Sequence, residues 1–369
     1  MSAVGTVGVI FGGRSGEHEV SLMSAGSVID ALGEAGYKCV EIGIDLDGHW
    51  YSGDEALDAF QTGQLEQLDR VALLAEPGSD SLFSWGLGEA LASLAELDVV
   101  FPVLHGTFGE DGTLQGLLEL ADVAYVGAGV LASSVAMDKG LFKHLMMAHE
   151  LPILPFEVLQ SGDIEQDPES AAAAAERVGD YPLFAKPANL GSSVGVTKCT
   201  SRSDLMEGLL EAARYDRRVV VERGIDAREI EISVLGNERP QASVAGEIRP
   251  SRDFYTYEAK YVDDASELLI PAPISDELMA EVERIALQAY QAIDGAGMGR
   301  VDFLLEKETD SLYLNEINTI PGFTRISMYP KLWAASGVEY PELCDRLIQL
   351  ALARQEQKSE LVRRYGGQL

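Results

Sequence analysis

Two acidic residues and an amide stand close together late in the chain, in a pattern that suits a metal ion. Asp302 lies in a mainly apolar segment that directly follows Arg300, and Glu316 and Asn318 follow after a short polar turn. Because side chains alternate along a strand, Glu316 and Asn318 face the same way, and a hairpin would bring Asp302 beside them. Two carboxylates and an amide oxygen suit hard cations such as Mg²⁺. On the spacing alone, a solvated face of an edge hairpin remains the alternative.

A glycine loop with the letters GSSVG occupies residues 191–195, and Lys186 ends the predicted strand before it. Small residues let backbone N–H groups approach an anion, and a nearby lysine adds a positive charge for phosphate groups. The lysine precedes the glycines, so this loop differs from the GxxxxGKS/T phosphate loop. A plain hairpin turn is the alternative, but the presence of the acidic cluster in the same chain favours phosphate binding.

Four further charged or titratable residues follow predicted strands or lie near these motifs. Glu17 lies in a loop after the first predicted strand, and His105 directly follows a later strand. Glu17 could bind a substrate ammonium group, or it could complement the dipole of the following helix. An isolated histidine is usually structural. Lys139, near the start of a helix, and Lys260, in a long polar loop, add positive charge, although each alone fits a solvated side chain.

The elements that must position these residues alternate between strand and helix in the first third of the chain. We expect strands at 7–11, 39–44, 99–104 and 123–126, and helices at 19–32 and 113–120. Such alternation predicts a parallel, doubly wound sheet, whose ligands bind beyond the carboxyl ends of the strands. Glu17 and His105 would therefore lie at one edge of this sheet.

The remaining two thirds predict two smaller α/β units. We expect helices at 133–149, 204–213, 276–293 and 340–355, and strands at 156–159, 183–186, 196–198, 219–222, 230–235, 242–248, 300–305 and 312–317. The strands on either side of the glycine loop would form a hairpin, and residues 250–266 would form a long functional loop. We divide the chain into domains at 1–130, 131–223 and 224–369.

Composition and charge exclude several classes of protein. The chain has 369 residues, with 60 Asp and Glu against 28 Lys and Arg, and a net charge of −32. Nucleic-acid binding and docking on an anionic membrane both need a basic surface. The three cysteines are far apart and the apolar runs are shorter than a membrane span of about 20 residues. We expect a cytoplasmic protein that binds neither nucleic acid nor membranes.

Seven ordered motifs resemble those of the D-alanine–D-alanine ligases of the ATP-grasp superfamily, over nearly the whole chain. They are GGRSGEHEVSL (12–22), LHGTFGEDG (104–112), MDK (137–139), AKPANLGSSVGV (185–196), FYTYEAKY (254–261), GRVDF (299–303) and NEINTIPGFTRIS (315–327). The resemblance implies an α/β fold of three domains: an N-terminal domain with a parallel sheet, a central domain with a flap, and a C-terminal domain with an antiparallel sheet. It also implies that the protein joins two D-alanines with ATP for peptidoglycan synthesis, and that it forms a homodimer.

The resemblance also implies a role for each matching residue. Catalytic or substrate-binding residues would be Glu17, His105, Ser192, Tyr261, Arg300, Gly322, Ser327 and Met328. ATP would contact Lys139, Lys186, Ser192, Ser193, Val194, Glu222, Arg223, Ile225, Glu229, Lys260, Asn315 and Glu316. Two Mg²⁺ or Mn²⁺ ions would bind Asp302, Glu316 and Asn318. The family commonly has lysine where Arg223 stands and often leucine where Met328 stands.

Three alternative functions compete with this interpretation. A related ligase could use D-lactate or D-serine as the second substrate, although the intact Lys260-Tyr261 pair favours an amine nucleophile, hence D-alanine. The second alternative is a relative that binds nucleotides without catalysis. Arg300 and the complete set of metal ligands argue against it, because such a protein would not need them. A dinucleotide-dependent dehydrogenase is excluded because Gly12-Gly13 lacks the remaining fingerprint glycines.

Overall fold

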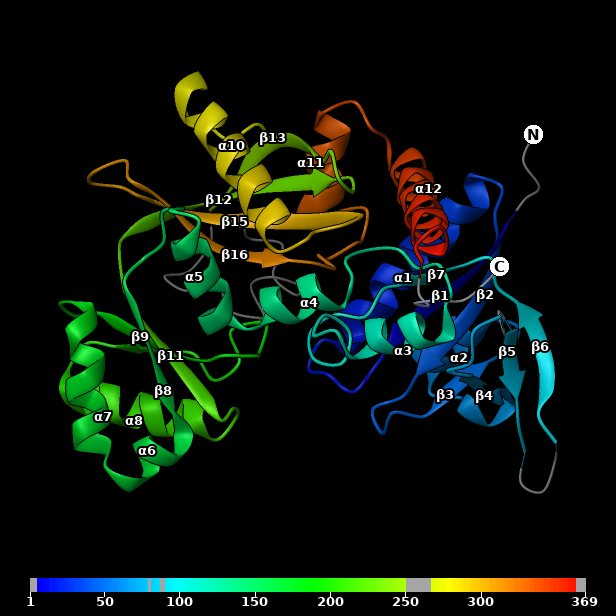
Figure 1. The fold of residues 1–369 in the computed structure, drawn as a ribbon, viewed down its shortest axis with the longest axis horizontal. Coiled ribbons are helices and arrows are strands. Elements are labelled where there is room, and N and C mark those ends of the chain that lie inside the picture. Colours follow the sequence, from blue (N-terminus) through cyan, green and yellow to red (C-terminus); the bar gives the residue numbers. More distant parts are fainter. Residues whose placement is uncertain (1–4, 79–80, 87–89, 250–266, 363–369) are drawn as a thin grey trace.

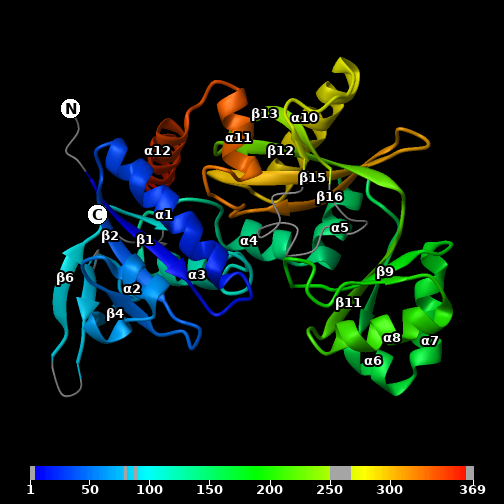
Figure 2. The same ribbon diagram turned by 180° about the vertical axis from the view of Figure 1, so that it is seen from behind.

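The computed structural model describes residues 5–78, 81–86, 90–249 and 267–362. Over these residues the chain forms three sheets, each covered by helices, with α4 (Val130–Met137) and α5 (Lys139–Ala148) between them (Figure 1). The view from behind shows the same arrangement (Figure 2). The α/β architecture expected from the sequence is confirmed.

The N-terminal sheet has the strand order β6-β5-β4-β3-β2-β1-β7. Its strands are β1 (Thr6–Gly12), β2 (Lys38–Ile44), β3 (Trp50–Ser52), β4 (Asp69–Leu73), β5 (Ser81–Ser84), β6 (Ala92–Glu96) and β7 (Val99–Pro102), and its helices are α1 (His18–Glu34), α2 (Ala56–Thr62) and α3 (Thr113–Ala121). Strand β1 pairs in parallel with β2 and β7, as predicted. The antiparallel strands β3 to β6 extend one edge and were not predicted, because they are short and lack a continuous apolar run.

The predicted strand at 123–126 is wrong as an independent element. Its residues are buried, but only one parallel bridge forms, between Tyr125 and Val100. Val100 donates to Ala124 O and accepts from Val126 N, at 2.8 and 2.9 Å. The apolar run therefore reflects burial beside β7 more than a full sheet strand.

The central sheet is antiparallel and carries the glycine loop. Its strands run in the order β10-β9-β11-β8, with β8 (Phe156–Gln160), β9 (Leu183–Pro187), β10 (Thr197–Cys199) and β11 (Arg218–Arg223). Helices α6 (Ser161–Gln166), α7 (Pro168–Ala175) and α8 (Arg202–Ala213) cover it. Strands β9 and β10 pair as the predicted hairpin around residues 191–195.

The single helix predicted at 133–149 is wrong, because Asp138 divides it into α4 and α5. The Asp138 backbone is extended, and its carboxylate accepts the Leu141 N–H at 2.9 Å, which caps the first turn of α5. Aspartate is among the residues that best cap a helix N-terminus. Lys139 therefore becomes the first residue of α5, and Lys143 follows one turn later.

The C-terminal sheet is also antiparallel, in the order β14-β13-β12-β15-β16. Its strands are β12 (Ala227–Leu235), β13 (Gln241–Arg249), β14 (Glu267–Leu269), β15 (Met298–Glu306) and β16 (Leu312–Asn318), and its helices are α10 (Asp276–Ala292), α11 (Met328–Ala335) and α12 (Tyr340–Ser359). The strand pairs 230–235 with 242–248 and 300–305 with 312–317 are confirmed. Apolar side chains of α4 and α5 pack against this sheet, so our division of the chain into domains at 130 and 223 stays a prediction.

A bulge in the β15–β16 hairpin sets which side chains face the cleft. Asp302 pairs with Glu316, but Phe303 pairs with Leu314, so Asn315 is the extra residue. The bulge shifts the alternation by one position. Leu314 and Ile317 therefore both point into the core, although they are three residues apart in sequence.

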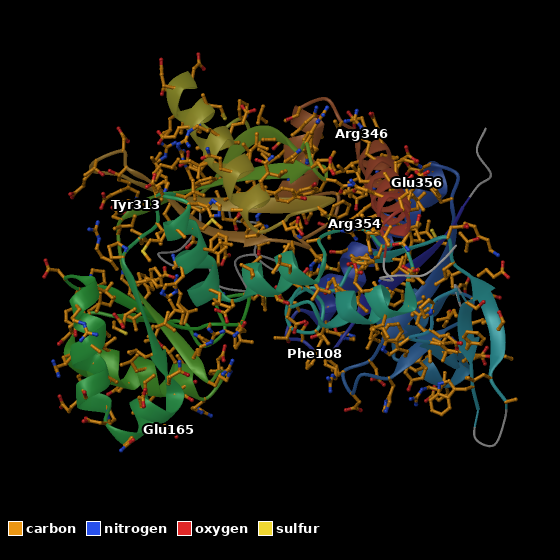
Figure 3. The ribbon with its side chains drawn as sticks, viewed as in Figure 1. Phe108, Glu165, Tyr313, Arg346, Arg354 and Glu356 are labelled. Atoms are coloured by element: carbon orange, nitrogen blue, oxygen red, sulfur yellow. The ribbon has the colours of Figure 1, made fainter. Side chains whose placement is uncertain are left out.

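Helix α12, near the C-terminal end of the chain, packs against the N-terminal domain. Arg354, labelled in Figure 3, donates to the carbonyl oxygens of Gly127 and Tyr125 at 2.5 and 3.0 Å and lies over the Tyr125 ring. Apolar residues of α12 share one core with β1, β7 and α1. Among the described residues, no helix is long and apolar enough to cross a membrane.

Candidate active site

A cleft of about 1530 Å³ lies where the three sheets meet. It is lined by most of the residues that the sequence predicted for the site: Glu17, His105, Lys139, Lys186, Ser192, Ser193, Glu222, Arg223, Ile225, Glu229, Arg300, Asp302, Asn315, Glu316, Asn318, Gly322, Ser327 and Met328. Val194 is not among the lining residues and is 40% exposed. Lys260 and Tyr261 lie outside the described residues.

One wall of the cleft is the acidic face of the β15–β16 hairpin. The Asn318 amide donates to Asp302 Oδ2 at 2.9 Å, and Glu316 pairs with Asp302 across the two strands. The Arg300 guanidinium binds both oxygens of Asp302, at 2.7 and 2.6 Å, and lies 3.0 Å from Glu231 Oε2. Arg300 thus binds two carboxylates, those of Asp302 and Glu231, and Glu316 lies beside Asp302.

The donor set of this wall fits a hard divalent cation. Asp302, Glu316 and Asn318 offer carboxylate and amide oxygens, which Mg²⁺ and Mn²⁺ favour. Oδ1 of Asp302 keeps a further lone pair beside its bond to Arg300, so it can also bind a cation, whereas Oδ2 already accepts from both Arg300 and Asn318. Glu231 was not predicted; it faces Arg300 because Glu231 and Asp302 are paired residues of β12 and β15.

The opposite wall carries lysines around a buried carboxylate. Lys186 on β9 donates to Glu222 Oε2 at 2.9 Å, and Lys143 on α5 lies 3.4 Å from Glu222 Oε1. Burial favours a raised pKa for Glu222, but the two ammonium groups outweigh burial and lower this pKa to about 2. Burial lowers the pKa of Lys143, and the Glu222 charge opposes that shift. Glu222 is therefore an anion held by two cations.

Lys143 was missed by the sequence analysis. Its side chain is only 1% exposed, and it projects from α5 one turn after Lys139. A fully buried lysine is rare unless it is paired. The spacing MDKGLFK carried the available signal, since residues four apart share one helix face.

The strand end after β11 forms the inner part of this wall. Arg223 donates to Glu306 Oε1 at 3.0 Å, and its backbone N–H donates to Pro155 O. Its side chain thus has a partner on the neighbouring sheet. Ile225 and Glu229 follow it along the cleft.

The glycine loop reaches the N-terminal domain through one short hydrogen bond. Ser192 Oγ donates to Glu17 Oε1 at 2.5 Å, across 175 positions of sequence. The position of Glu17 also explains why residues 106 and 191 are glycines. A Cβ atom at Gly106 or Gly191 would lie only 2.5 or 3.1 Å from Glu17 Oε2. Ser192 and Ser193 both have positive φ angles, of 50° and 58°, a conformation that costs energy for residues with a side chain.

His105 and the unpredicted Glu110 bind the backbone of Ile320. His105 Nδ1 lies 2.9 Å from Ile320 O and its Nε2 lies 3.1 Å from Ser24 Oγ, while Glu110 Oε1 accepts the Ile320 N–H at 2.9 Å. Burial lowers the pKa of His105, against the charge of Glu17. Burial and the charge of Glu17 raise the pKa of Glu110 to about 8. Both ring nitrogens of His105 are thus used by the protein. Its predicted binding of substrate stays a prediction.

The end of the site after β16 is a tight turn that leads into α11. The Thr324 N–H donates to Ser327 Oγ at 3.1 Å, and Ser327 is the residue that precedes α11. Met328 packs its side chain against Ile248 and Leu332. Met328 also lines the cleft, and its predicted contact with substrate stays a prediction.

Comparison with known proteins identifies the family. The family model described as "D-ala D-ala ligase N-terminus" matches residues 6–128, and that described as "D-ala D-ala ligase C-terminus" matches residues 145–349. A D-alanine–D-alanine ligase of Thermoanaerobacter sp. (strain X514) is 51% identical over 354 residues, which cover 95% of this chain and 98% of that protein. The D-alanine–D-alanine ligase of Heliobacterium modesticaldum is 49% identical, with 96% of each chain covered.

Solved structures agree with the sequence relatives. The D-alanine-D-alanine ligase from Coxiella burnetii superposes with a TM-score of 0.81 at 34% identity and covers 98% of each chain. The VanG D-Ala:D-Ser ligase from Enterococcus faecalis gives a TM-score of 0.83 at 31% identity, over 95% of this chain and 100% of that chain. On these matches, and on a cleft that gathers the motif residues of all three sheets, the chain belongs to the D-alanine–D-alanine ligase family.

Proposed function

We propose that this protein joins two molecules of D-alanine with ATP, through an acylphosphate, and releases ADP, phosphate and the dipeptide used in peptidoglycan. The family assignment supports this reaction. The observation that carries the proposal is that a wall rich in lysines and a wall rich in carboxylates face each other across one cleft. Lysines of α5 and β9 face the carboxylates of β15 and β16 across a space large enough for a nucleotide.

ATP lies in this proposal between the central and C-terminal sheets. The segment Glu222, Arg223 and Ile225 lines the adenine, and Glu229 binds the ribose. Lys139, Lys186 and the backbone of the glycine loop, with Ser192, Ser193 and Val194, bind the phosphates; Asn315 and Glu316 lie beside them, and Lys260 adds charge from its loop. The consecutive positive φ angles of Ser192 and Ser193 support a loop shaped for an anion.

Asp302, Glu316 and Asn318 hold two Mg²⁺ or Mn²⁺ ions in this account. Their oxygen donors support the assignment. When bound, such ions neutralise charge that builds up on the transferred phosphoryl group.

In the first half of the reaction, a carboxylate oxygen of D-alanine 1 attacks the γ-phosphorus of ATP and ADP leaves. Both reactants are anions, so the lysines of the cleft lower their mutual repulsion. Glu17 holds the ammonium group of D-alanine 1, and its bond to Ser192 draws the glycine loop over the reactants. Tyr261 completes this hydrogen-bonded set.

In the second half, the amine of D-alanine 2 attacks the carbonyl carbon, and phosphate leaves with its C–O bond electrons. Arg300 and the N–H of Gly322 stabilise the tetrahedral oxyanion, a kind of contact worth about 10²–10³ in rate. Ser327 and the backbone N–H of Met328, at the start of α11, bind the carboxylate of D-alanine 2. The 250–266 loop excludes water that would otherwise hydrolyse the acylphosphate.

D-Alanine is the second substrate in this proposal. The curated relatives at about half identity are named D-alanine–D-alanine ligases, whereas a structural neighbour at 31% identity is a D-Ala:D-Ser ligase. The Lys260-Tyr261 pair of the EAKY motif also supports an amine nucleophile.

The family resemblance further supports a cytoplasmic homodimer. The three cysteines Cys39, Cys199 and Cys344 are free thiols, which fits a reducing compartment. Light scattering of the purified protein tests the oligomeric state: a mass near twice 39.8 kDa is expected, and the monomer mass contradicts the proposal.

One assay tests the function directly. Purified protein is incubated with ATP, Mg²⁺ and D-alanine, alone or with D-serine or D-lactate, and phosphate release and products are measured. We expect one phosphate per D-alanyl-D-alanine, with D-alanine preferred over both competitors. Phosphate release without a dipeptide, or mainly the ester or mixed dipeptide at neutral pH, would refute it.

A further inference from the structure

The turn that follows β16 is held from the N-terminal domain at three backbone groups. Glu110 Oε1 accepts the Ile320 N–H at 2.9 Å, and His105 Nδ1 binds the Ile320 carbonyl at 2.9 Å. Ser24 Oγ on α1 accepts the Phe323 N–H at 3.4 Å. Gly322 lies between these two fixed points, so both flanks of its peptide are tied to the N-terminal domain.

The hydrogen bonds form a directed chain. A carbonyl oxygen only accepts, so His105 Nδ1 must carry the proton that bonds Ile320 O. In this neutral tautomer Nε2 is an acceptor, and the Ser24 hydroxyl at 3.1 Å donates to it. The Ser24 oxygen remains free to accept the Phe323 N–H. Each group in the chain thus has a defined donor or acceptor role.

The second oxygen of Glu110 ties down the other side. Glu110 Oε2 accepts the Gly106 N–H at 2.8 Å, within the loop that follows β7. One carboxyl group therefore joins the β7 loop to the turn after β16. Residues 105 and 110 are thereby fixed relative to residue 320, although they are more than 200 positions apart in sequence.

The Gly322 N–H itself points to no protein acceptor among the described residues of the chain. The neighbouring backbone groups of the turn have hydrogen-bond partners in the protein. The hydroxyl of Tyr340 donates to the Phe323 carbonyl, and the Thr324 N–H donates to Ser327 Oγ. A backbone donor fixed on both sides and left for a ligand is the arrangement that an oxyanion site needs.

We propose that Ser24, His105 and Glu110 are positioning residues that clamp the Ile320–Phe323 turn and so aim the Gly322 N–H at the reacting carbonyl. This assignment gives His105 a role through Ile320 in place of direct substrate contact, and it rests on the proposed function for the identity of the oxyanion. Because a misplacement of about 1 Å in an active site can cost about 10²-fold in rate, loosening the clamp should lower kcat.

Two amide substitutions of His105 separate the clamp from general structure. In His105→Asn the side-chain amide can replace Nδ1 and donate to Ile320 O; in His105→Gln it replaces Nε2, near Ser24, and loses the bond to Ile320. We expect His105→Gln to lower kcat about ten- to hundredfold, and His105→Asn to lower it less, because the bond to Ile320 O is kept and only the contact with Ser24 is lost. The KM for ATP should not change in either variant, because the clamp does not contact the nucleotide wall.

A second readout does not depend on turnover. Backbone hydrogen exchange of the peptide that spans residues 319–324 should rise in His105→Gln and in Glu110→Ala, which removes the acceptor of the Ile320 N–H, and should rise less in His105→Asn. Ser24→Ala should raise exchange at Phe323, whereas Ser27→Ala, on the same helix and bonded only to Met23 O, should not. If His105→Gln does not fold, the Ser24 and Glu110 variants carry the test.

The outcomes are distinct. Equal kcat and equal exchange in His105→Asn and His105→Gln would overturn the clamp, as would unchanged exchange in Glu110→Ala. Absence of dipeptide from the wild-type protein would instead overturn the proposed function, and the exchange measurements would still decide whether the clamp exists.

Discussion

The two walls of the cleft carry opposite charge patterns. The wall of α5 and β9 has Lys143 and Lys186 paired with the carboxylate of Glu222, together with Lys139, whose ammonium donates to the Leu190 carbonyl at 2.6 Å. On the other wall, formed by β12, β15 and β16, Arg300 binds the carboxylates of Glu231 and Asp302, and Glu316 pairs with Asp302 across the strands. A chain with a net charge of −32 has thus placed three of its nine lysines on the wall where a triphosphate would lie.

The difference between the walls teaches what each must bind. An excess of buried cations calls for an anion, and an excess of clustered carboxylates calls for cations. A nucleotide with divalent ions satisfies both walls at once.

Substitution on the acidic wall should have the largest effect. Glu316→Gln keeps the shape of the side chain and removes one metal-binding charge, so we expect turnover to fall by about 10³-fold. Steady-state phosphate release measures this change. Glu308→Gln, in the exposed turn of the same hairpin, is the matched control and should retain activity. Similar losses in both variants would show that hairpin stability, not the carboxylate, matters.

Arg300 should separate chemistry from nucleotide binding. Arg300→Lys keeps the charge but loses the two-pronged contact with Asp302, and we expect kcat to fall about 10²-fold. Calorimetric titration with a non-hydrolysable ATP analogue should give nearly unchanged affinity. Arg346→Lys, in an exposed ion pair on α12, should behave as the wild type. A large loss of nucleotide affinity in Arg300→Lys would contradict its role at the oxyanion.

Lys143 should affect the lysine wall through Glu222. Without Lys143, Lys186 is the remaining lysine bound to Glu222 and is held away from phosphate. We expect Lys143→Met to weaken binding of the ATP analogue by about tenfold. The same substitution in a Glu222→Gln background should have a much smaller effect, because the buried charge is gone. Additive losses in the double variant would rule out this coupling.

The smallest effect is on pH stability. The pKa of Glu222 is about 2 in the folded protein against an ordinary value of 4.5. A lowered carboxyl pKa stabilises the fold above pH 4.5, and this contribution is lost as pH falls toward 2. Between pH 5 and 3, Tm should therefore fall more steeply for the wild type than for Glu222→Gln. Parallel curves would contradict the pairing of Glu222 with two lysines.

The sequence predicted the elements that carry strong periodicity and the motif residues that share the cleft. The parallel strands β1, β2 and β7 and the two C-terminal hairpins followed from apolar runs. The break at Asp138 was missed because a capping carboxylate competes with an otherwise continuous helical pattern. Boundaries of this kind depend on a single side-chain hydrogen bond.

Partnerships between distant residues could not be predicted. Lys143 and Glu222 come from different elements, and Glu110 meets Ile320 across 210 positions. A single sequence gives no sign of such contacts, which arise only when the three sheets pack together. The bulge at Asn315 is a similar case. Leu314 and Ile317 are both apolar but are three residues apart, which does not fit the alternation of a regular strand. Only the pairing of Glu316 with Asp302 and of Leu314 with Phe303 shows where the extra residue lies.

The central claim is that a triphosphate and divalent ions join the two walls. A crystal of the protein with a non-hydrolysable ATP analogue and Mn²⁺, examined by anomalous scattering, tests it most directly. We expect two manganese peaks bonded to oxygens of Asp302, Glu316 and Asn318, with the γ-phosphate between them and Lys186. Manganese elsewhere, or a triphosphate away from these side chains, would contradict the account.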